Sequence, residues 1–134
     1  MKYLLDTNAC IVHLRSKGKS IVSSRIISAG NDIAVSAIVC EELFYGALRT
    51  PSPTKSLADV KAFLSKFRSL PFDDIAAEHC ARIRSQLDRA GERIQINDVM
   101  IAAVALAHGL TLVTHNVRHL GRVPGLSIED WQSD

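Results

Sequence analysis

The stretch Ile101-Ala-Ala-Val-Ala-Leu-Ala-His-Gly109-Leu-Thr-Leu-Val113-Thr-His-Asn116 decides the fold class of this chain. Its first half carries apolar residues at helical spacing, at Ile101, Ala102 and Ala105. Gly109 stands where a glycine would end that helix, and the apolar run that follows has the length of a strand. A helix that leads directly into a strand is typical of a sheet covered by helices.

The same alternation extends over the rest of the chain. Strand-length apolar runs occur at Tyr3 to Leu5, Ile33 to Val35, Leu70 to Phe72, Leu110 to Val113 and Leu126 to Ile128. Helical spacing occurs at Val60, Phe63, Leu64 and Phe67, and again at Ile75, His79, Ile83 and Leu87. Strands that alternate with helices predict βαβ units, so we expect an α/β fold with a mainly parallel central sheet of roughly four or five strands.

The chain has the size of one compact domain. It contains 134 residues, and we expect a single domain over residues 1–134. The stretch Thr50-Pro51-Ser52-Pro53-Thr54 forbids a continuous helix, and we interpret it as the connection between two helices of that domain.

Composition and charge exclude several classes of protein. Apolar residues make up 47% and charged residues 22% of the chain, which is typical of a globular protein and not of a disordered one. The net charge of +2 is too small to indicate a polyanion-binding protein by itself. No C-x-x-C pair, signal peptide or membrane-length apolar run occurs, so we expect a soluble cytoplasmic protein without a membrane partner.

Polar residues directly follow the first and the fourth of the expected strands. Leu5 is followed by Asp6, and Val113 is followed by Thr114-His115-Asn116. Ligands of open parallel sheets bind beyond the carboxyl ends of the strands, so Asp6 and Asn116 should lie at the same edge. Thr7 or Asn8 could instead be an ordinary N-cap of the next helix.

Two further segments place acidic residues among apolar ones. Asp98 lies three, four and seven residues before Ile101, Ala102 and Ala105, so its carboxylate shares their inward face, although Asn97 or Asp98 could also be a helix cap. Glu41 and Glu42 follow the second expected strand, and periodicity does not choose between them. Both could be acids of a first helical turn.

Carboxylates that converge on one crevice repel each other unless a cation lies among them. A set of hard oxygen ligands without cysteine favours Mg²⁺, with Mn²⁺ as a substitute, over zinc. Such an ion activates water for hydrolysis of a phosphodiester, and Thr114 or Ser36 could orient that water or a ligand.

Four blocks of this sequence resemble the VapC toxins of the PIN-domain ribonuclease family, over nearly the whole chain. The blocks are Leu5-Asp6-Thr7-Asn8, then Glu42-Leu43-Phe44-Tyr45-Gly46, then Asp98 with Ile101-Ala102-Ala103 and Ala105, and last Leu112-Val113-Thr114-His115-Asn116 with Gly125-Leu126 and Glu129-Asp130-Trp131. The second block favours Glu42 over Glu41.

The resemblance implies a fold, a site and partners. The fold is a three-layer α/β/α PIN-like fold with a protruding helical pair, which we expect to help form a groove for an antitoxin helix. The resemblance implies an Mg²⁺-dependent endoribonuclease toxin with Asp6, Glu42 and Asp98 as metal ligands, and Asn116 and Thr114 beside them in the catalytic site. It also implies a structured RNA substrate such as a tRNA loop, a VapB-like antitoxin and a homodimer.

This sequence departs from the family at two positions. Asn116 stands where many PIN nucleases have a fourth acid, so it can bind as a neutral ligand but not act as a base. Gln95 stands where relatives often have glycine, which puts the turn before Asp98 in question. Glu41 could act on the site indirectly, by contact with a residue that binds the metal.

Other interpretations remain open at the level of sequence. The chain could be a non-catalytic α/β module that binds RNA or protein, or a metallo-phosphoesterase for small phosphates. Arginines near the acidic segments are either RNA contacts or a solvated helix face; the candidates are Arg84, Arg93 and Arg118. His115 and His119 have the spacing of a zinc dyad but lack the glutamate of an H-E-x-x-H motif. Trp131 and Phe44 could stack on bases but are more typical of a core or a dimer contact.

Overall fold

The computed structural model describes residues 1–132. The elements along the chain are β1 (Tyr3–Leu5), α1 (Thr7–Arg15), α2 (Ile21–Ala29), the 3-10 turn η1 (Gly30–Asp32), β2 (Ile33–Ser36), α3 (Ala37–Leu48), α4 (Pro53–Leu64), β3 (Arg68–Leu70), α5 (Asp74–Arg89), α6 (Ile96–His108), β4 (Thr111–Val113), α7 (Val117–Leu120) and β5 (Ile128–Glu129).

The strands form one sheet of five in the order β3-β2-β1-β4-β5, and every neighbouring pair is parallel. The central strand β1 pairs with β2 and β4, which places Leu5 between Val35 and Val113. The carboxyl ends of these three strands therefore lie side by side. The expected parallel sheet is confirmed.

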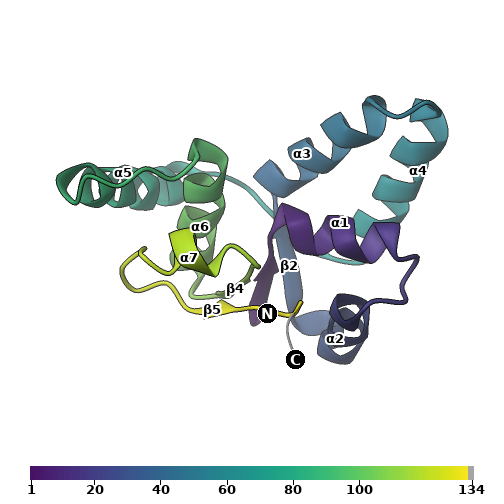
Figure 1. Cartoon of the computed structure of the whole chain (residues 1–134), viewed down its shortest axis with the longest axis horizontal. Coiled ribbons are helices and arrows are strands. Elements are labelled where there is room, and N and C mark those ends of the chain that lie inside the picture. The colour runs from purple at the N-terminus through teal and green to yellow at the C-terminus, as the bar shows by residue number, and fades with distance from the viewer. Residues whose placement is uncertain (133–134) are drawn as a thin grey trace.

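Helices cover both faces of the sheet. In Figure 1, α5, α6 and α7 lie to one side of β1 and β4, whereas α1 to α4 lie to the other. Helices α3 and α4 form an antiparallel pair that projects away from the sheet, and Pro53 occupies the first turn of α4, where its missing N–H costs no hydrogen bond. The predicted α/β/α layers and protruding helical pair are confirmed.

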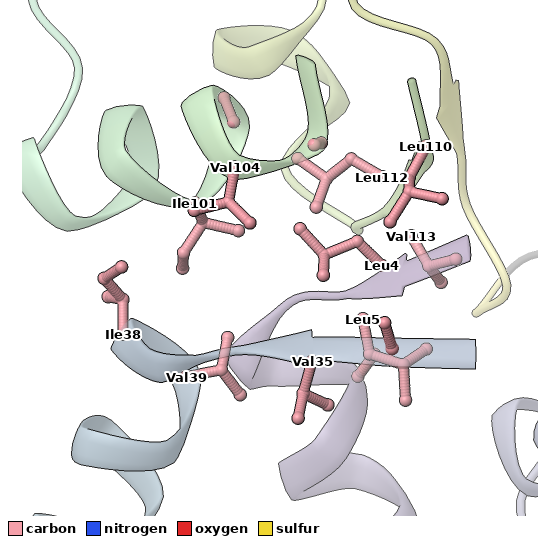
Figure 2. Close-up of a cluster of buried hydrophobic side chains, with 14 of the residues drawn as sticks. Leu4, Leu5, Val35, Ile38, Val39, Ile101, Val104, Leu110, Leu112 and Val113 are labelled. Carbon is pink, nitrogen blue, oxygen red and sulfur yellow. The ribbon is translucent and has the colours of Figure 1, made fainter. Parts of the chain in front are cut away.

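The core forms on both sides of the sheet because successive side chains of a strand point to opposite faces. Figure 2 shows Leu4 and Leu112 toward Ile101 and Val104 of α6, whereas Leu5 points to the opposite face. All five side chains are at most 2% exposed. Gly109 ends α6 with φ +64° and ψ +32°, the left-handed conformation predicted for it.

Two predicted strands are shifted along the chain, and one apolar residue of a predicted helix faces solvent. Strand β3 covers Arg68–Leu70 and not residues 70–72, because Pro71 has no N–H to continue the ladder. Strand β5 covers Ile128–Glu129 and not residues 126–128, since only these two residues pair with β4. On α5, Ile75 is 64% exposed, and the buried stripe begins one residue later, at Ala76.

Within residues 1–132, no helix is both long enough and apolar enough to cross a membrane.

Candidate active site

Asp6 combines a structural and an electrostatic function at the carboxyl end of β1. It is the N-cap of α1, and its Oδ1 accepts a hydrogen bond of 2.8 Å from the backbone N–H of Ala9, so neither Thr7 nor Asn8 is the cap. Its side chain also hydrogen-bonds Thr114. Asp6 is only 9% exposed, and this burial raises the pKa of its carboxyl group.

The end of β4 lies directly beside Asp6. The backbone N–H of Asp6 donates to the carbonyl oxygen of Val113 at 3.0 Å, and Thr114, the next residue, is 1% exposed. The hydroxyl oxygen of Thr114 accepts from the backbone N–H of Asn116 at 3.0 Å. The parallel register of β1 and β4 therefore brings Asp6 and Asn116 to one edge, as the sequence predicted.

Asp98 lies in the first turn of α6, half-buried. Asn116 Nδ2 donates to its Oδ2 at 3.4 Å, which connects α6 to the end of β4. Burial is the main cause that raises the pKa of Asp98, and Glu42 raises it further, while Asn116 and the nearby His119 oppose the shift. The N-cap is Gln95, so neither Asn97 nor Asp98 is a cap.

Glu42 reaches the site from α3. Its Oε1 accepts a hydrogen bond of 2.7 Å from the Thr7 hydroxyl, whereas Glu41 is exposed. Both glutamates lie beyond the first turn of α3, which contains no acid. Ser36 is the N-cap of α3 and is fully buried, with its hydroxyl oxygen accepting from the Val39 N–H at 3.3 Å.

The carboxylates of Asp6, Glu42 and Asp98 influence one another. Both Asp98 and Glu42 raise the pKa of Asp6, and Glu42 raises that of Asp98. As oriented in residues 1–132, no three His, Cys, Asp or Glu side chains form a group that could hold a metal ion. In this arrangement Glu42 Oε1 is held by the Thr7 hydroxyl and Asp6 Oδ1 by the Ala9 N–H.

The predicted RNA-contact arginines are spread over the outer surface. Arg93 lines a hollow of 410 Å³ together with Asp98 and Asn116. Arg84 lies on α5 beside a neighbouring hollow that Arg93 also borders, and Arg118 is exposed on α7. Of these three arginines, Arg93 is the one that lines a hollow together with a proposed metal ligand, Asp98.

His115 and His119, the pair with zinc-dyad spacing, contact different residues through their Nδ1 atoms. His115 Nδ1 lies 2.9 Å from Asp130 Oδ2, and His119 Nδ1 lies 2.9 Å from Asn116 Oδ1. Trp131 is 4% exposed and packs edge-on against Tyr3 with ring centroids 5.0 Å apart, as expected of a core residue.

Sequence reasoning missed two contacts of this site. It considered Thr7 only as a cap, and it considered His119 only as a zinc ligand. The bond between Thr7 and Glu42 joins residues 35 positions apart and leaves no local signal. The contact of His119 with Asn116 spans three residues and could have been found if the short helix α7 had been predicted.

Comparison with known proteins agrees with this geometry. The family model of the PIN domain matches residues 3–126. The tRNA(fMet)-specific endonuclease VapC of Salmonella typhimurium is 39% identical over 131 residues, which cover 98% of each chain. Ribonuclease VapC2 of Haemophilus influenzae is 37% identical over 131 residues, again 98% of each chain.

Solved structures show the same likeness. A crystal structure of DNA-bound VapBC from Salmonella typhimurium aligns with a TM-score of 0.93 at 38% identity, covering 98% of both chains. VapBC2 from Rickettsia felis, bound to a DNA fragment from its promoter, aligns with a TM-score of 0.89 at 30% identity over 98% of this chain and 99% of that one. The chain therefore belongs to the PIN-domain family, among the VapC proteins.

Proposed function

We propose that this protein is a divalent-metal-dependent endoribonuclease and the toxin of a toxin–antitoxin pair. The observation that carries the proposal is the electrostatic interaction among Asp6, Glu42 and Asp98 at the carboxyl edge of the sheet, where burial and the neighbouring acids raise the pKa of both aspartates. The names of the relatives, a tRNA(fMet)-specific endonuclease and a ribonuclease, support RNA as the substrate.

The donor set fits a hard divalent cation. Carboxylate oxygens are the ligands that Mg²⁺ and Mn²⁺ prefer. Burial is the main cause of the two raised pKa values, and a cation would relieve the repulsion among the carboxylates that adds to it. Asp6, Glu42 and Asp98 would hold the ion. When bound, such an ion supplies a more acidic water and neutralises charge on the phosphoryl oxygens.

The other residues of the site orient these carboxylates. Thr114 fixes Asp6 through its hydroxyl, and Asn116 donates to Asp98, so both acids keep defined positions. Asn116 has no titratable group and therefore orients or binds without exchanging protons. Thr7 holds Glu42 in the present conformation.

Cleavage of RNA by purified protein tests this proposal. Wild-type protein and the Asp6→Asn variant are incubated with total bacterial RNA, with Mg²⁺, with Mn²⁺ or with EDTA, and the cleavage ends are mapped by sequencing. We expect discrete cuts, foremost in tRNA loops, that require both Asp6 and the metal. RNA that wild-type protein binds but leaves intact under every condition would favour a non-catalytic binding module.

The antitoxin should bind in the groove between α1 and the α3–α4 pair. This groove has a volume of 340 Å³ and is lined mainly by apolar side chains, among them Ile11, Leu14, Leu43, Ala47 and Val60. Arg15, Glu42 and Asp59 also line it, so an occupant would reach a proposed metal ligand. An amphipathic antitoxin helix fits such a groove, and the VapBC complexes among the solved structures support this partner.

A second apolar surface supports the expected homodimer. Tyr45 and Leu48 are 60% and 57% exposed on the outer face of α3, beside a hollow of 730 Å³ that reaches β3. A second copy of the chain would remove this apolar surface from water. Light scattering should show a dimer for the wild-type protein. For Leu48→Asp it should show a shift toward monomer.

A further inference from the structure

The hollow beside Asp98 contains residues that the proposed metal site does not use. It has a volume of 410 Å³, within the range of pockets that bind small organic groups. Its lining residues are Arg93, Ile94, Gln95, Asp98, Asn116 and His119. Asp98 is a proposed metal ligand and Asn116 donates a hydrogen bond to it, so the hollow borders the proposed site of cleavage.

Polar groups of the hollow are available to a ligand. Within residues 1–132, the Gln95 carboxamide and the Arg93 guanidinium make no hydrogen bond or ion pair. Gln95 is the N-cap of α6 by position, but its side chain does not bind the helix. His119 engages Asn116 through Nδ1, which leaves Nε2 for another partner.

The two walls of the hollow are connected to each other. Arg93, Ile94 and Gln95 come from the segment after α5, whereas Asn116 and His119 come from the segment after β4. Arg122 Nε lies 3.4 Å from Glu92 Oε2, which joins these two segments just outside the hollow. The backbone N–H of Glu92 donates to Leu87 at 2.9 Å, which anchors that wall to α5.

The chemistry of this lining matches one unpaired nucleotide. A nucleobase has an apolar face and a polar edge, and proteins read unpaired bases by contact with the face and hydrogen bonds to the edge. Ile94 is half-buried and offers an apolar surface, while Gln95 offers both a donor and an acceptor. Arg93 supplies a cation for the adjoining phosphate.

We propose that this hollow binds the nucleotide next to the cleaved phosphodiester, and that Gln95 and His119 determine which base is accepted there. The inference rests on the proposed ribonuclease function, because it names the part of the RNA that the same site reads. Gln95 has φ −57° and ψ +142°, an extended conformation open to any residue, so a glycine is not required at this position.

Two measurements on an RNA library with random sequence test the proposal. The first maps cleavage by wild-type protein, Gln95→Ala, Gln95→Glu and the control Gln86→Ala, which changes an exposed glutamine of α5 that does not line the hollow. The second sequences the RNA retained by the Asp6→Asn protein with and without Gln95→Ala, because Asp6 does not line the hollow and this protein should bind without cutting.

Wild-type protein and Gln86→Ala should prefer one base beside the cut. Gln95→Ala should reduce that preference about three- to tenfold, the loss of one or two hydrogen bonds, with a smaller effect on total cleavage. Gln95→Glu, which only accepts, should shift the preference toward bases with amino groups. In the second measurement, adding Gln95→Ala to the Asp6→Asn protein should remove the same base preference from the RNA that the protein retains.

The outcomes separate the two proposals. Identical base preferences with and without Gln95, in both measurements, would overturn the nucleotide subsite while leaving the ribonuclease intact. A Gln95-dependent preference in bound RNA without any cleavage would support the subsite and overturn the ribonuclease. The absence of any base preference in wild-type protein would likewise overturn the subsite.

Discussion

At the scale of single residues, the two aspartates of the site each make hydrogen bonds that hold the fold and also supply a negative charge. Asp6 caps α1 and also supplies a buried carboxylate, and Asp98 lies on the inward face of α6 while accepting from Asn116. Replacing either aspartate with asparagine keeps the shape and an accepting oxygen but removes the charge. The two contributions can therefore be separated by experiment.

Asp98→Asn should abolish cleavage and leave the fold intact. The substitution removes a proposed metal ligand, and it also removes a charge whose raised pKa shows that the folded protein disfavours it. The free energy of unfolding without metal should be equal to or above that of wild-type protein at pH 7. Cleavage assays and urea denaturation check both parts, with Asp88→Asn on the exposed face of α5 as control. Cleavage at the wild-type rate would refute the assignment of Asp98.

His13 lies near the connection of α1 and α2 and should make the stability of the protein depend on pH. Its Nδ1 lies 2.8 Å from the hydroxyl oxygen of fully buried Ser23, and its ring packs on Phe63. Burial, and to a lesser extent Lys66, lower the pKa of His13 below the ordinary 6.5.

A lowered pKa means that the unfolded chain binds the proton more tightly than the folded protein. The stability contributed by neutral His13 is therefore present above pH 6.5 and is lost as the pH falls through the lower folded value. Urea denaturation is measured between about pH 7.5 and about pH 5, the region in which histidines titrate. Over this range, His13→Asn should lose less stability than wild-type protein. Equal losses would contradict the prediction.

At the scale of elements, the α3–α4 pair forms a groove that contains a glycine in the middle of a helix. Gly46 lies within α3 and lines the groove, and a Cβ added there would meet nothing within 4 Å. A glycine inside a helix costs roughly 1 kcal/mol relative to alanine. The protein itself leaves the space at Gly46 open, so a partner that approaches the helix closely can occupy it.

Gly46→Leu should stabilise the free protein and weaken antitoxin binding. The substitution removes the glycine cost, up to about 1 kcal/mol, and places a side chain in the groove. Thermal unfolding and calorimetric titration with the antitoxin check the two effects. Ala81→Leu, on the exposed face of α5, is the matched control and should leave binding unchanged. If Gly46→Leu bound the antitoxin with wild-type affinity, the antitoxin would not occupy this groove.

At the scale of the whole molecule, the proposed ion would link three elements that come from distant parts of the sequence. Asp6 comes from the end of β1, Glu42 from α3 and Asp98 from α6. A ligand that binds only the folded protein stabilises it by about 2.7 kcal/mol at a hundredfold excess over its dissociation constant. Metal binding should therefore be visible as an increase in thermal stability.

Mg²⁺ or Mn²⁺ should raise the melting temperature of wild-type protein by several degrees relative to EDTA. The same addition should leave Asp6→Asn and Asp98→Asn nearly unchanged, because each lacks one charged ligand. Differential scanning calorimetry over a range of metal concentrations checks this. An equal increase in all three proteins would mean that the ion binds outside the carboxylates.

The sequence predicted the sheet well because the pattern of apolar strands and helices is local. It also predicted that Asp6 and Asn116 meet, since parallel strands end at a common edge. Periodicity could not choose between Glu41 and Glu42, because the choice depends on the distant contact with Thr7. The shift of β3 was predictable in principle from Pro71, whereas the hollow at Gln95 arises only when two remote segments meet.

The strand order carries a consequence for the timing of biosynthesis. Strand β1 emerges first from the ribosome, but its neighbour β4 is made more than a hundred residues later, at Thr111–Val113. Thr114 and Asn116, which hold the two aspartates, come later still. A nascent chain cannot assemble the site before Thr114 and Asn116 have been made, so the ribosome that makes this protein is not exposed to a completed site while the residues before them are translated.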